Sequence, residues 1–204
     1  MDDMTTDTEA GQWRKAPGRP RDARADDAIL EAVIALLSSG QSAAAMSMEA
    51  VAAKAGVGKA TLYRRWPNKE TLLVDAMLRM KGPPPVPQGR SLREDLILLA
   101  TRPIGKDNEK HTRATACLLP EIAKNPELYD VWQRVTEPRR NVTREVLRRG
   151  IETGELRADL DVELTTLMLS APSMAQNLFH FNPAVPAEGL AEKIVDAILR
   201  GAAA

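Results

Sequence analysis

The stretch SMEAVAAKAGVGKATLYRRW, residues 47–66, decides the fold. Its spacing predicts a short helix that Ser47 caps, a tight turn at Gly56, and a second helix over 59–65. Two helices that meet at such a turn cross closely, so they need small or apolar residues on their facing sides. The facing positions all meet this need: Val51, Ala52, Gly56, Val57 and Leu62. The pattern is that of a helix-turn-helix.

The outward side of the second helix carries small, polar or basic residues, which suits contact with DNA. The N-terminal end of such a helix enters the major groove, where Lys59 and Arg64 can donate to guanine edges or phosphates. The alternative is a helical hairpin whose basic residues only face solvent. The predicted DNA contacts in and beside this segment are Ser47, Gly58, Lys59, Ala60, Thr61, Tyr63, Arg64 and Lys69.

The string GVGKATLYRRWPNKETLL, residues 56–73, resembles the tetracycline-repressor (TetR) family. That family has a valine-containing turn, a Thr/Ser-Leu-Tyr step, a bulky pair and an Asn/Ser-Lys-Glu start to the next helix. The resemblance runs from the first helix through Met80 and implies a DNA-binding regulator that is usually a repressor. It also implies which residues face which part of DNA: phosphates for Ser47, Thr61, Tyr63 and Lys69, and bases for Lys59, Ala60 and Arg64. The departures from the family pattern are Trp66 and Pro67, and a recognition helix made unusually basic by Arg64 and Arg65.

A second contact is expected from the basic segment at 14–24. Arg19 and Arg21 flank a proline, and an extended arginine-rich segment can enter a narrow, A·T-rich minor groove. The alternative is a solvated tail that adds only nonspecific attraction.

Composition favours an all-α protein, with an N-terminal three-helix helix-turn-helix DNA-binding domain and a larger helical ligand-binding and dimerisation domain. Aromatic residues make up only 3% of the 204 residues, and β-branched alternation is scarce. The formal net charge is zero, but residues 11–81 carry a net charge of +5 and residues 82–204 a net charge of −1. Positive charge therefore gathers where a phosphate-binding surface needs it.

The chain is expected to be cytoplasmic and without a membrane partner. Its single cysteine excludes an internal disulfide, and no apolar run reaches the roughly 18 residues of a spanning helix. The N-terminus lacks the basic start and apolar stretch of a signal peptide.

Breakers along the chain predict its organisation. The Pro-rich stretch after Lys81 ends a helix over 69–81 and separates two cores. A first helix is expected to begin at Asp26 or Asp27, and later helices to span 108–124, 127–152, 161–179 and 187–200, kinked or split at Pro120, Pro138 and Pro172. The predicted domains are an arm over 1–23, a DNA-binding domain over 24–81, a linker over 82–90 and an effector-binding and dimerisation domain over 91–204.

The C-terminal part is expected to bind a small, largely apolar effector and to form a homodimer through 161–179 and 187–200. Its effector is expected to act on the spacing of the recognition helices through the helix over 69–81. Each candidate pocket residue has a plain core role as its alternative: Cys117, Leu118, Trp132, Met168, Met174 and Phe179.

No catalytic signature, cofactor motif or metal-ligand spacing is present, so neither an enzyme nor a metal or cofactor site is expected. The function expected is a ligand-released repressor that binds a palindromic double-stranded DNA operator as a homodimer. Two alternatives remain: a ligand-independent activator or architectural factor, and an all-α enzyme that uses His111 or His180 as a base.

Overall fold

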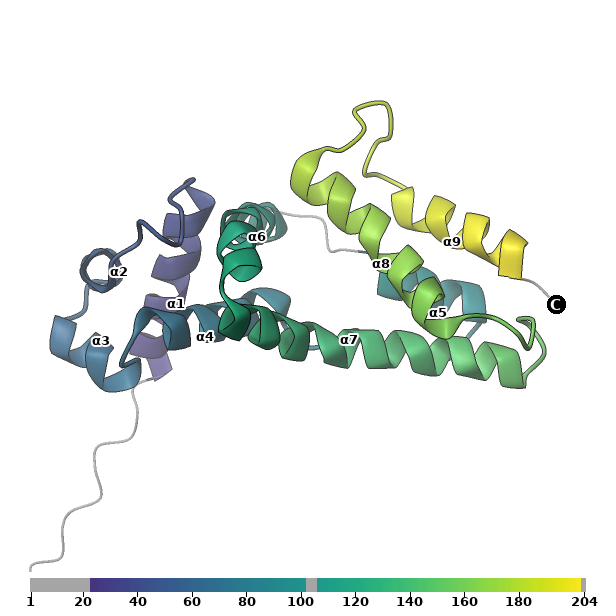
Figure 1. Ribbon diagram of the computed structural model, residues 1–204, viewed down its shortest axis with the longest axis horizontal. Helices are drawn as coiled ribbons and strands as arrows, with labels where there is room; N and C mark the ends of the chain where they lie inside the picture. Colours follow the sequence, from purple (N-terminus) through teal and green to yellow (C-terminus); the bar gives the residue numbers. More distant parts are fainter. Residues whose placement is uncertain (1–22, 102–105, 203–204) are drawn as a thin grey trace, which may run out of the picture.

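The structure is a computed structural model that describes residues 23–101 and 106–202, and in these ranges every regular element is an α-helix (Figure 1). The all-α prediction is confirmed. The first four helices are α1 (Ala23–Ser38), α2 (Met48–Ala55), α3 (Lys59–Arg65) and α4 (Lys69–Lys81). The others are α5 (Leu92–Ala100), α6 (Lys106–Lys124), α7 (Pro126–Glu152), α8 (Val162–Phe179) and α9 (Leu190–Ala202).

Local chemistry sets the boundaries of the helix-turn-helix. The Ser47 hydroxyl accepts a hydrogen bond from the backbone N–H of Ala50 at 3.1 Å and so caps α2. Gly56 ends α2 with φ +67°, a left-handed conformation that glycine adopts without strain. The Asn68 side chain caps α4 by accepting from Thr71 N–H at 2.9 Å. Helix α1 begins at Ala23, earlier than the predicted Asp26 or Asp27.

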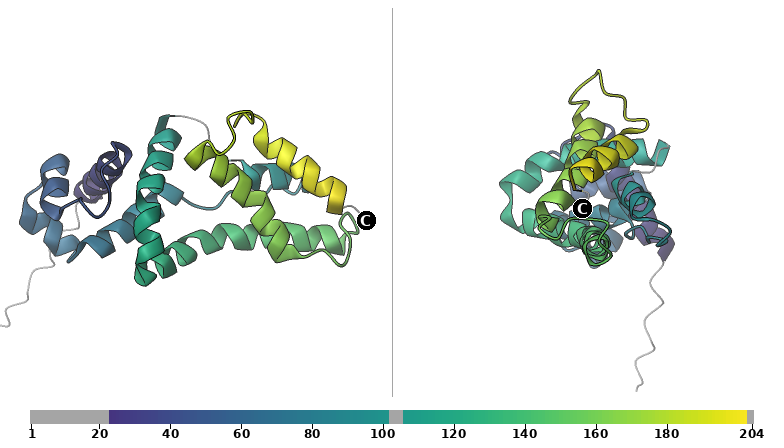
Figure 2. Two further views of the ribbon diagram at one scale, coloured as in Figure 1. Left: turned by 45° about the horizontal axis from the view of Figure 1, so that its top comes forward. Right: turned by 90° about the vertical axis from the view of Figure 1, so that its right-hand side faces the viewer.

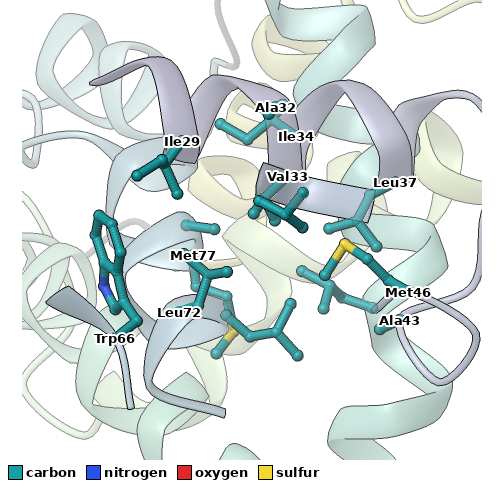
Figure 3. Close-up of a cluster of buried hydrophobic side chains, with 14 of the residues drawn as sticks. Ile29, Ala32, Val33, Ile34, Leu37, Ala43, Met46, Trp66, Leu72 and Met77 are labelled. Atoms are coloured by element: carbon teal, nitrogen blue, oxygen red, sulfur yellow. The ribbon is translucent and has the colours of Figure 1, made fainter. Parts of the chain in front are cut away.

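The first hydrophobic core lies under the helix-turn-helix (Figure 3). Helix α1 supplies its largest share, and α2, α3 and α4 close around that helix. Three residues of α6 join the same core: Ala114, Leu118 and Ile122, each at most 4% exposed. Helix α6 therefore lies beyond the Pro-rich linker in sequence but packs into the core that precedes it, and Figure 2 shows it between α1–α4 and the remaining helices.

The second core joins α5, α7, α8 and α9. Leu96, Leu147 and Val195 are almost completely buried in it. At Gly150 of α7, an added Cβ would lie 2.8 Å from Leu156 Cδ1 and 3.0 Å from Leu92 Cδ2, so glycine permits the close approach of α7 to its neighbours.

The three internal prolines do not divide their helices into separate elements. Pro120, Pro138 and Pro172 lie inside the continuous helices α6, α7 and α8. Proline removes one backbone donor but leaves the flanking turns able to pair, so a long helix with packed neighbours tolerates it.

The linker is fixed to the second core by a buried carboxylate. Asp95 of α5 is 2% exposed and accepts hydrogen bonds from the backbone N–H groups of Gln88 at 2.9 Å and Gly89 at 3.1 Å. The Arg149 guanidinium donates to the same carboxylate at 2.5 Å. Burial alone would raise the pKa of Asp95, but Arg149 and the two backbone donors outweigh it and hold that pKa below its ordinary value of 3.8.

Candidate nucleic-acid interface and adjoining cavity

Helix α3 presents most of its predicted DNA contacts on one surface. Lys59, Ala60, Tyr63 and Arg64 are exposed, with the Lys59 side chain 68% exposed and Tyr63 43% exposed. Leu62 is completely buried and fixes the opposite side of the helix in the core. These four side chains therefore point away from the core, as a groove-reading surface requires.

Three further predicted contacts lie at helix ends around this surface. Gly58 is the exposed N-cap of α3, and Ser47 is the exposed N-cap of α2. The Lys69 ammonium, in the first turn of α4, donates to the backbone carbonyls of Ala43 and Ala44 at 3.0 and 3.1 Å. Lys69 thus fixes the loop between α1 and α2 in addition to carrying positive charge.

The remaining predicted contacts are Thr61 and the two arginines of the N-terminal segment. Thr61 is half-buried, so it offers less of its side chain than the other α3 residues. Arg19 and Arg21, the predicted minor-groove contacts, lie outside the described residues.

An acidic residue that the sequence analysis did not single out lies beside this surface. Glu49 of α2 accepts a hydrogen bond from the Tyr63 hydroxyl at 3.3 Å, and its carboxylate lies 3.8 Å from the Lys59 ammonium. A hydrogen bond from its own backbone N–H, with the charge of Lys59 and the Tyr63 hydroxyl, lowers the pKa of Glu49. In the protein without DNA, the Glu49 carboxylate therefore already contacts two predicted DNA donors, Lys59 and Tyr63.

Arg65, the second of the two adjacent arginines, does not share the exposed face. Its side chain is 12% exposed and pairs with Asp26 of α1, and its guanidinium also donates to the Thr61 carbonyl at 3.3 Å. Next to it, the buried Trp66 indole donates to Asp75 of α4 at 2.8 Å. These bonds set the angles of α3 against α1 and α4, so of the arginine pair only Arg64 lies on the outward face.

A cavity of about 750 Å³ is lined mainly by residues of α6, of the C-terminal end of α8 and of the chain around the start of α9. Figure 1 shows α6 next to the C-terminal end of α8. Its volume falls in the range of small-molecule sites. Helix α6 contributes Glu109, Thr112 and Arg113, and α8 contributes Ser173 and Asn177. The remaining lining comes from the end of α5, from His180 and from the start of α9: Ala100, Thr101 and residues 187–192.

Helix α6 connects this cavity to the DNA-binding part of the chain. Next to Glu109, the Lys110 ammonium reaches the Glu31 carboxylate of α1 at 2.6 Å. Arg79 of α4 donates to the same carboxylate at 3.4 Å and to Asp27 at 2.6 Å. The hydrogen bond from Lys110, with the charges of both cations, lowers the pKa of Glu31 against the opposing effect of burial. Glu31 is thus the point at which α1, α4 and α6 meet.

The predicted pocket residues do not line this cavity. Leu118 is completely buried in the first core, and Cys117 and Trp132 pack against that core. The other three, Met168, Met174 and Phe179, are 46%, 37% and 60% exposed on α8. An apolar stripe is the usual sequence signal of a ligand pocket, but this lining instead carries the polar residues Glu109, Thr112, Arg113, Glu188 and Glu192.

The outward side of α8 is unusually apolar for an exposed surface. Leu164 and Leu167 are 52% and 60% exposed, and Met168 follows on the same side. The opposite side of α8 buries Thr165, Leu169 and Ser173, among others. No element within residues 23–101 and 106–202 covers this apolar side.

The described residues contain neither a metal-binding cluster nor a membrane-spanning helix. No group of three or more histidine, cysteine or acidic side chains there is placed to bind a metal ion. No helix in those ranges is both long enough and apolar enough to cross a membrane.

Comparison with known proteins agrees with this architecture. Residues 29–76 match the family model described as bacterial regulatory proteins, tetR family. Residues 86–198, more than half of the chain, match the model of the tetracyclin repressor-like C-terminal domain.

Individual relatives support the same assignment. The HTH-type transcriptional regulator YdeS of Bacillus subtilis is 31% identical over 157 residues, which cover 76% of this chain and 79% of that protein. The HTH-type transcriptional regulator AqdR of Rhodococcus erythropolis is 31% identical over 175 residues, which cover 81% and 78%. The fold is also that of the transcriptional regulator FadR of Bacillus subtilis, solved in complex with stearoyl-CoA, with a TM-score of 0.66 at 19% identity over 86% of this chain and 98% of that one. The chain belongs to the TetR family of transcriptional regulators and carries an N-terminal helix-turn-helix DNA-binding domain.

Proposed function

We propose that this regulator is a homodimeric repressor that binds a palindromic operator and leaves it when a small molecule enters the cavity beside α6. One observation carries the proposal. The same helix lines the cavity with Glu109, Thr112 and Arg113 and places Ala114 and Leu118 in the core of the DNA-binding domain. A ligand that shifts α6 therefore also shifts the packing under the helix-turn-helix.

The coupling runs through α1 as well as through α4. Lys110 and Arg79 both bind Glu31, so a displacement of α6 changes the support of both helices. A second connection joins α4 to α7, because the Lys81 ammonium lies 4.1 Å from the centre of the Trp132 ring. From the sequence, we expect α4 to transmit the signal. In this proposal, α4 and α1 both transmit it. The FadR structure with stearoyl-CoA supports a ligand site in this fold, although the two ligands need not be alike.

The exposed side of α8, with α9 beside it, is the proposed dimer surface. An exposed apolar stripe on a helix that already buries its other side is typical of an interface between subunits. Met168, Met174 and Phe179 then serve dimerisation in place of ligand binding. A two-fold axis there would present two copies of α3 to major grooves about 34 to 36 Å apart.

On DNA, Arg64 is assigned to base edges, because it is exposed and not held by another described side chain. Lys59 and Ala60 lie toward the bases, and Ser47, Thr61, Tyr63 and Lys69 toward phosphates. Gly58 permits close approach of the backbone.

The decisive experiment selects bound fragments from random DNA and then measures affinity for the selected site. Palindromic fragments with two similar half-sites support the dimer, whereas unrelated fragments or single half-sites contradict it. On that site, Arg64→Ala should relax the preference at one position of each half-site, and Lys69→Ala should weaken binding to all sequences alike. Loss of preference in both variants would contradict the assigned roles.

Repression is tested with a reporter gene behind the selected site. Reporter output that falls when the regulator is expressed supports repression, and output that rises shows an activator. An operator affinity that no cavity ligand changes would leave a DNA-binding protein without ligand control.

A further inference from the structure

The cavity beside α6 has an excess of negative charge at its lining. Glu109 comes from α6, Glu188 from the turn before α9, and Glu192 from the first turn of α9. None of the three forms an ion pair with any residue that the structure describes. Arg113 is the one arginine or lysine among the described lining residues, so the net charge is −2 with His180 neutral.

Arg93 of α5 does not cancel this negative charge. It interacts electrostatically with Glu192, but its guanidinium donates hydrogen bonds to both oxygens of Asp196, at 2.6 and 3.1 Å. A bidentate pair of this kind leaves little of the arginine charge for other partners. The three glutamates therefore remain available to a positively charged ligand.

A serine hydroxyl without a protein partner also lines the cavity. Thr165, Thr166 and Ser170 of α8 each donate to the carbonyl four residues earlier, at 2.7, 2.8 and 3.2 Å. Ser173 is 4% exposed and lines the cavity, yet its hydroxyl makes no hydrogen bond to any residue within 23–101 or 106–202. No fully buried side-chain polar atom in the described residues lacks a partner, so this hydroxyl oxygen opens onto the cavity, where an occupant can supply its hydrogen bond.

Asn177 adds an acceptor beside that hydroxyl. Its side-chain amide donates to the Ser173 carbonyl at 2.7 Å, which holds the amide nitrogen against the helix and leaves its oxygen as an acceptor. The apolar part of the lining comes from Ala100, Leu190 and Ala191. Carboxylates and an amide oxygen accept hydrogen bonds, and the short aliphatic residues accommodate a hydrocarbon body.

We propose that the cavity binds an amphiphilic organic cation, an amine or quaternary ammonium group carried on an apolar body. The charged group lies among Glu109, Glu188 and Glu192, and a polar atom of the body meets Ser173 and Asn177. This proposal names the ligand class of the cavity and rests on the proposed ligand-released repression. Because the excess charge is negative, an anion of the same shape is repelled.

The test uses three fluorescent probes of similar shape and different charge with the full-length protein. Dansyl cadaverine is a cation at pH 7, its N-acetyl derivative is neutral, and dansyl aminohexanoate is an anion. Dansyl emission rises in an apolar cavity, so a titration gives the affinity of each probe. We expect the cation to bind about tenfold more tightly than the other two probes.

Variants locate the site. Glu109→Gln and Glu188→Gln should each weaken the cation several-fold and leave the neutral probe unchanged, because they remove charge while keeping shape. Ser173→Ala should weaken all three probes by a similar factor. Glu145→Gln, an exposed change of the same type on α7 outside the cavity lining, is the matched control and should change nothing.

Equal or tighter binding of the neutral or anionic probe, cation binding that survives both glutamate changes, or failure of all three probes to bind would overturn the proposal. Operator release is measured separately, from the anisotropy of labelled operator selected from random DNA. If the cation binds with the expected glutamate dependence and the operator affinity stays constant, the cation site stands and ligand-released repression fails. If another small molecule releases the operator and the cation does not bind, ligand-released repression stands and the cation site fails.

Discussion

At the scale of single residues, Glu49 is an acidic group beside the surface that is predicted to contact DNA phosphates. Its contacts with Lys59 and Tyr63 hold two DNA-facing donors in place at the cost of negative charge near the nucleic acid. Desolvation and the Glu49 carboxylate raise the pKa of the Tyr63 phenol, which therefore stays protonated as a donor. Glu49 therefore has two opposing effects: it orients Lys59 and Tyr63, and its negative charge lowers the affinity for DNA.

Glu49→Gln should strengthen binding to DNA of any sequence by roughly two- to fivefold, because it removes a repulsive charge and releases Lys59. Fluorescence anisotropy with the selected operator and with a scrambled duplex measures both affinities at equal salt. Glu145→Gln carries the same charge change on α7 and should have little effect. Weaker binding by Glu49→Gln to both duplexes would show that holding Lys59 and Tyr63 matters more than the charge.

Helical spacing correctly placed Lys59, Ala60, Tyr63 and Arg64 on the exposed side opposite the buried Leu62. The same spacing left Arg65 out of the predicted contacts, but it did not show which partner holds Arg65. That partner, Asp26, lies 39 residues earlier in the chain. Long-range ion pairs have no local signal, and the same holds for Lys69 with the carbonyls of Ala43 and Ala44.

At the scale of elements, the linker acts as a packed segment. The Asp95 carboxylate collects two backbone N–H groups and Arg149, so the chain after α4 enters α5 along a fixed path. The composition predicted a semi-rigid spacer, but proline content alone does not show that one buried aspartate fixes its end.

Asp95→Asn should lower the free energy of unfolding by about 2 kcal/mol at pH 7, because hydrogen bonds to a charged group are lost or weakened. The folded pKa of Asp95 lies below its ordinary value of 3.8, so this stabilisation is present above pH 4 and disappears as the pH falls through the folded pKa. Urea unfolding at pH 7 and pH 3 should therefore show a smaller difference between wild type and variant at the lower pH. A difference that stays constant between the two would contradict this role of the carboxylate.

The second element-scale feature is the junction of α1, α4 and α6 at Glu31. Lys110→Met keeps the length of the side chain and removes the ion pair, whose groups are 30% and 44% exposed. The free energy of unfolding should fall by less than about 1 kcal/mol, as for other partly exposed pairs. Amide hydrogen exchange should nonetheless become faster in α1 and in the first turns of α6, because the ion pair that joins these segments is lost.

Hydrogen-exchange mass spectrometry measures this effect segment by segment. Lys124→Met, at the exposed far end of α6, is the control and should leave α1 unchanged. Unchanged exchange of α1 in the Lys110 variant would show that core packing alone couples the two helices.

At the scale of the whole molecule, the sequence predicted one core on each side of the linker. The described residues form two cores, but the first extends beyond the linker into α6. The assignment of α6 to the first core escaped prediction, because its apolar spacing shows that one side is buried without showing against which partner. The cavity escaped prediction for a related reason: its lining residues come from four helices and the segments beside them, so no single segment stands out. Close packing at Gly150 was equally hidden, since a lone glycine near the end of a helix is more often only a terminator.

The proposed dimer would determine how the whole molecule reads DNA. Leu167 is 60% exposed on the apolar side of α8, so Leu167→Glu places a charge in the proposed interface without disturbing the fold of one chain. Sedimentation equilibrium should show a monomer. If each half-site uses about four phosphate contacts, the slope of log affinity against log salt should change from about −7 to about −4. Leu98→Glu, an exposed substitution of the same type on α5, should leave both the dimer and the slope intact. The proposed interface is wrong if the Leu167→Glu protein remains dimeric or if the wild type sediments as a monomer. Another arrangement would then have to place two recognition helices on one side of the duplex.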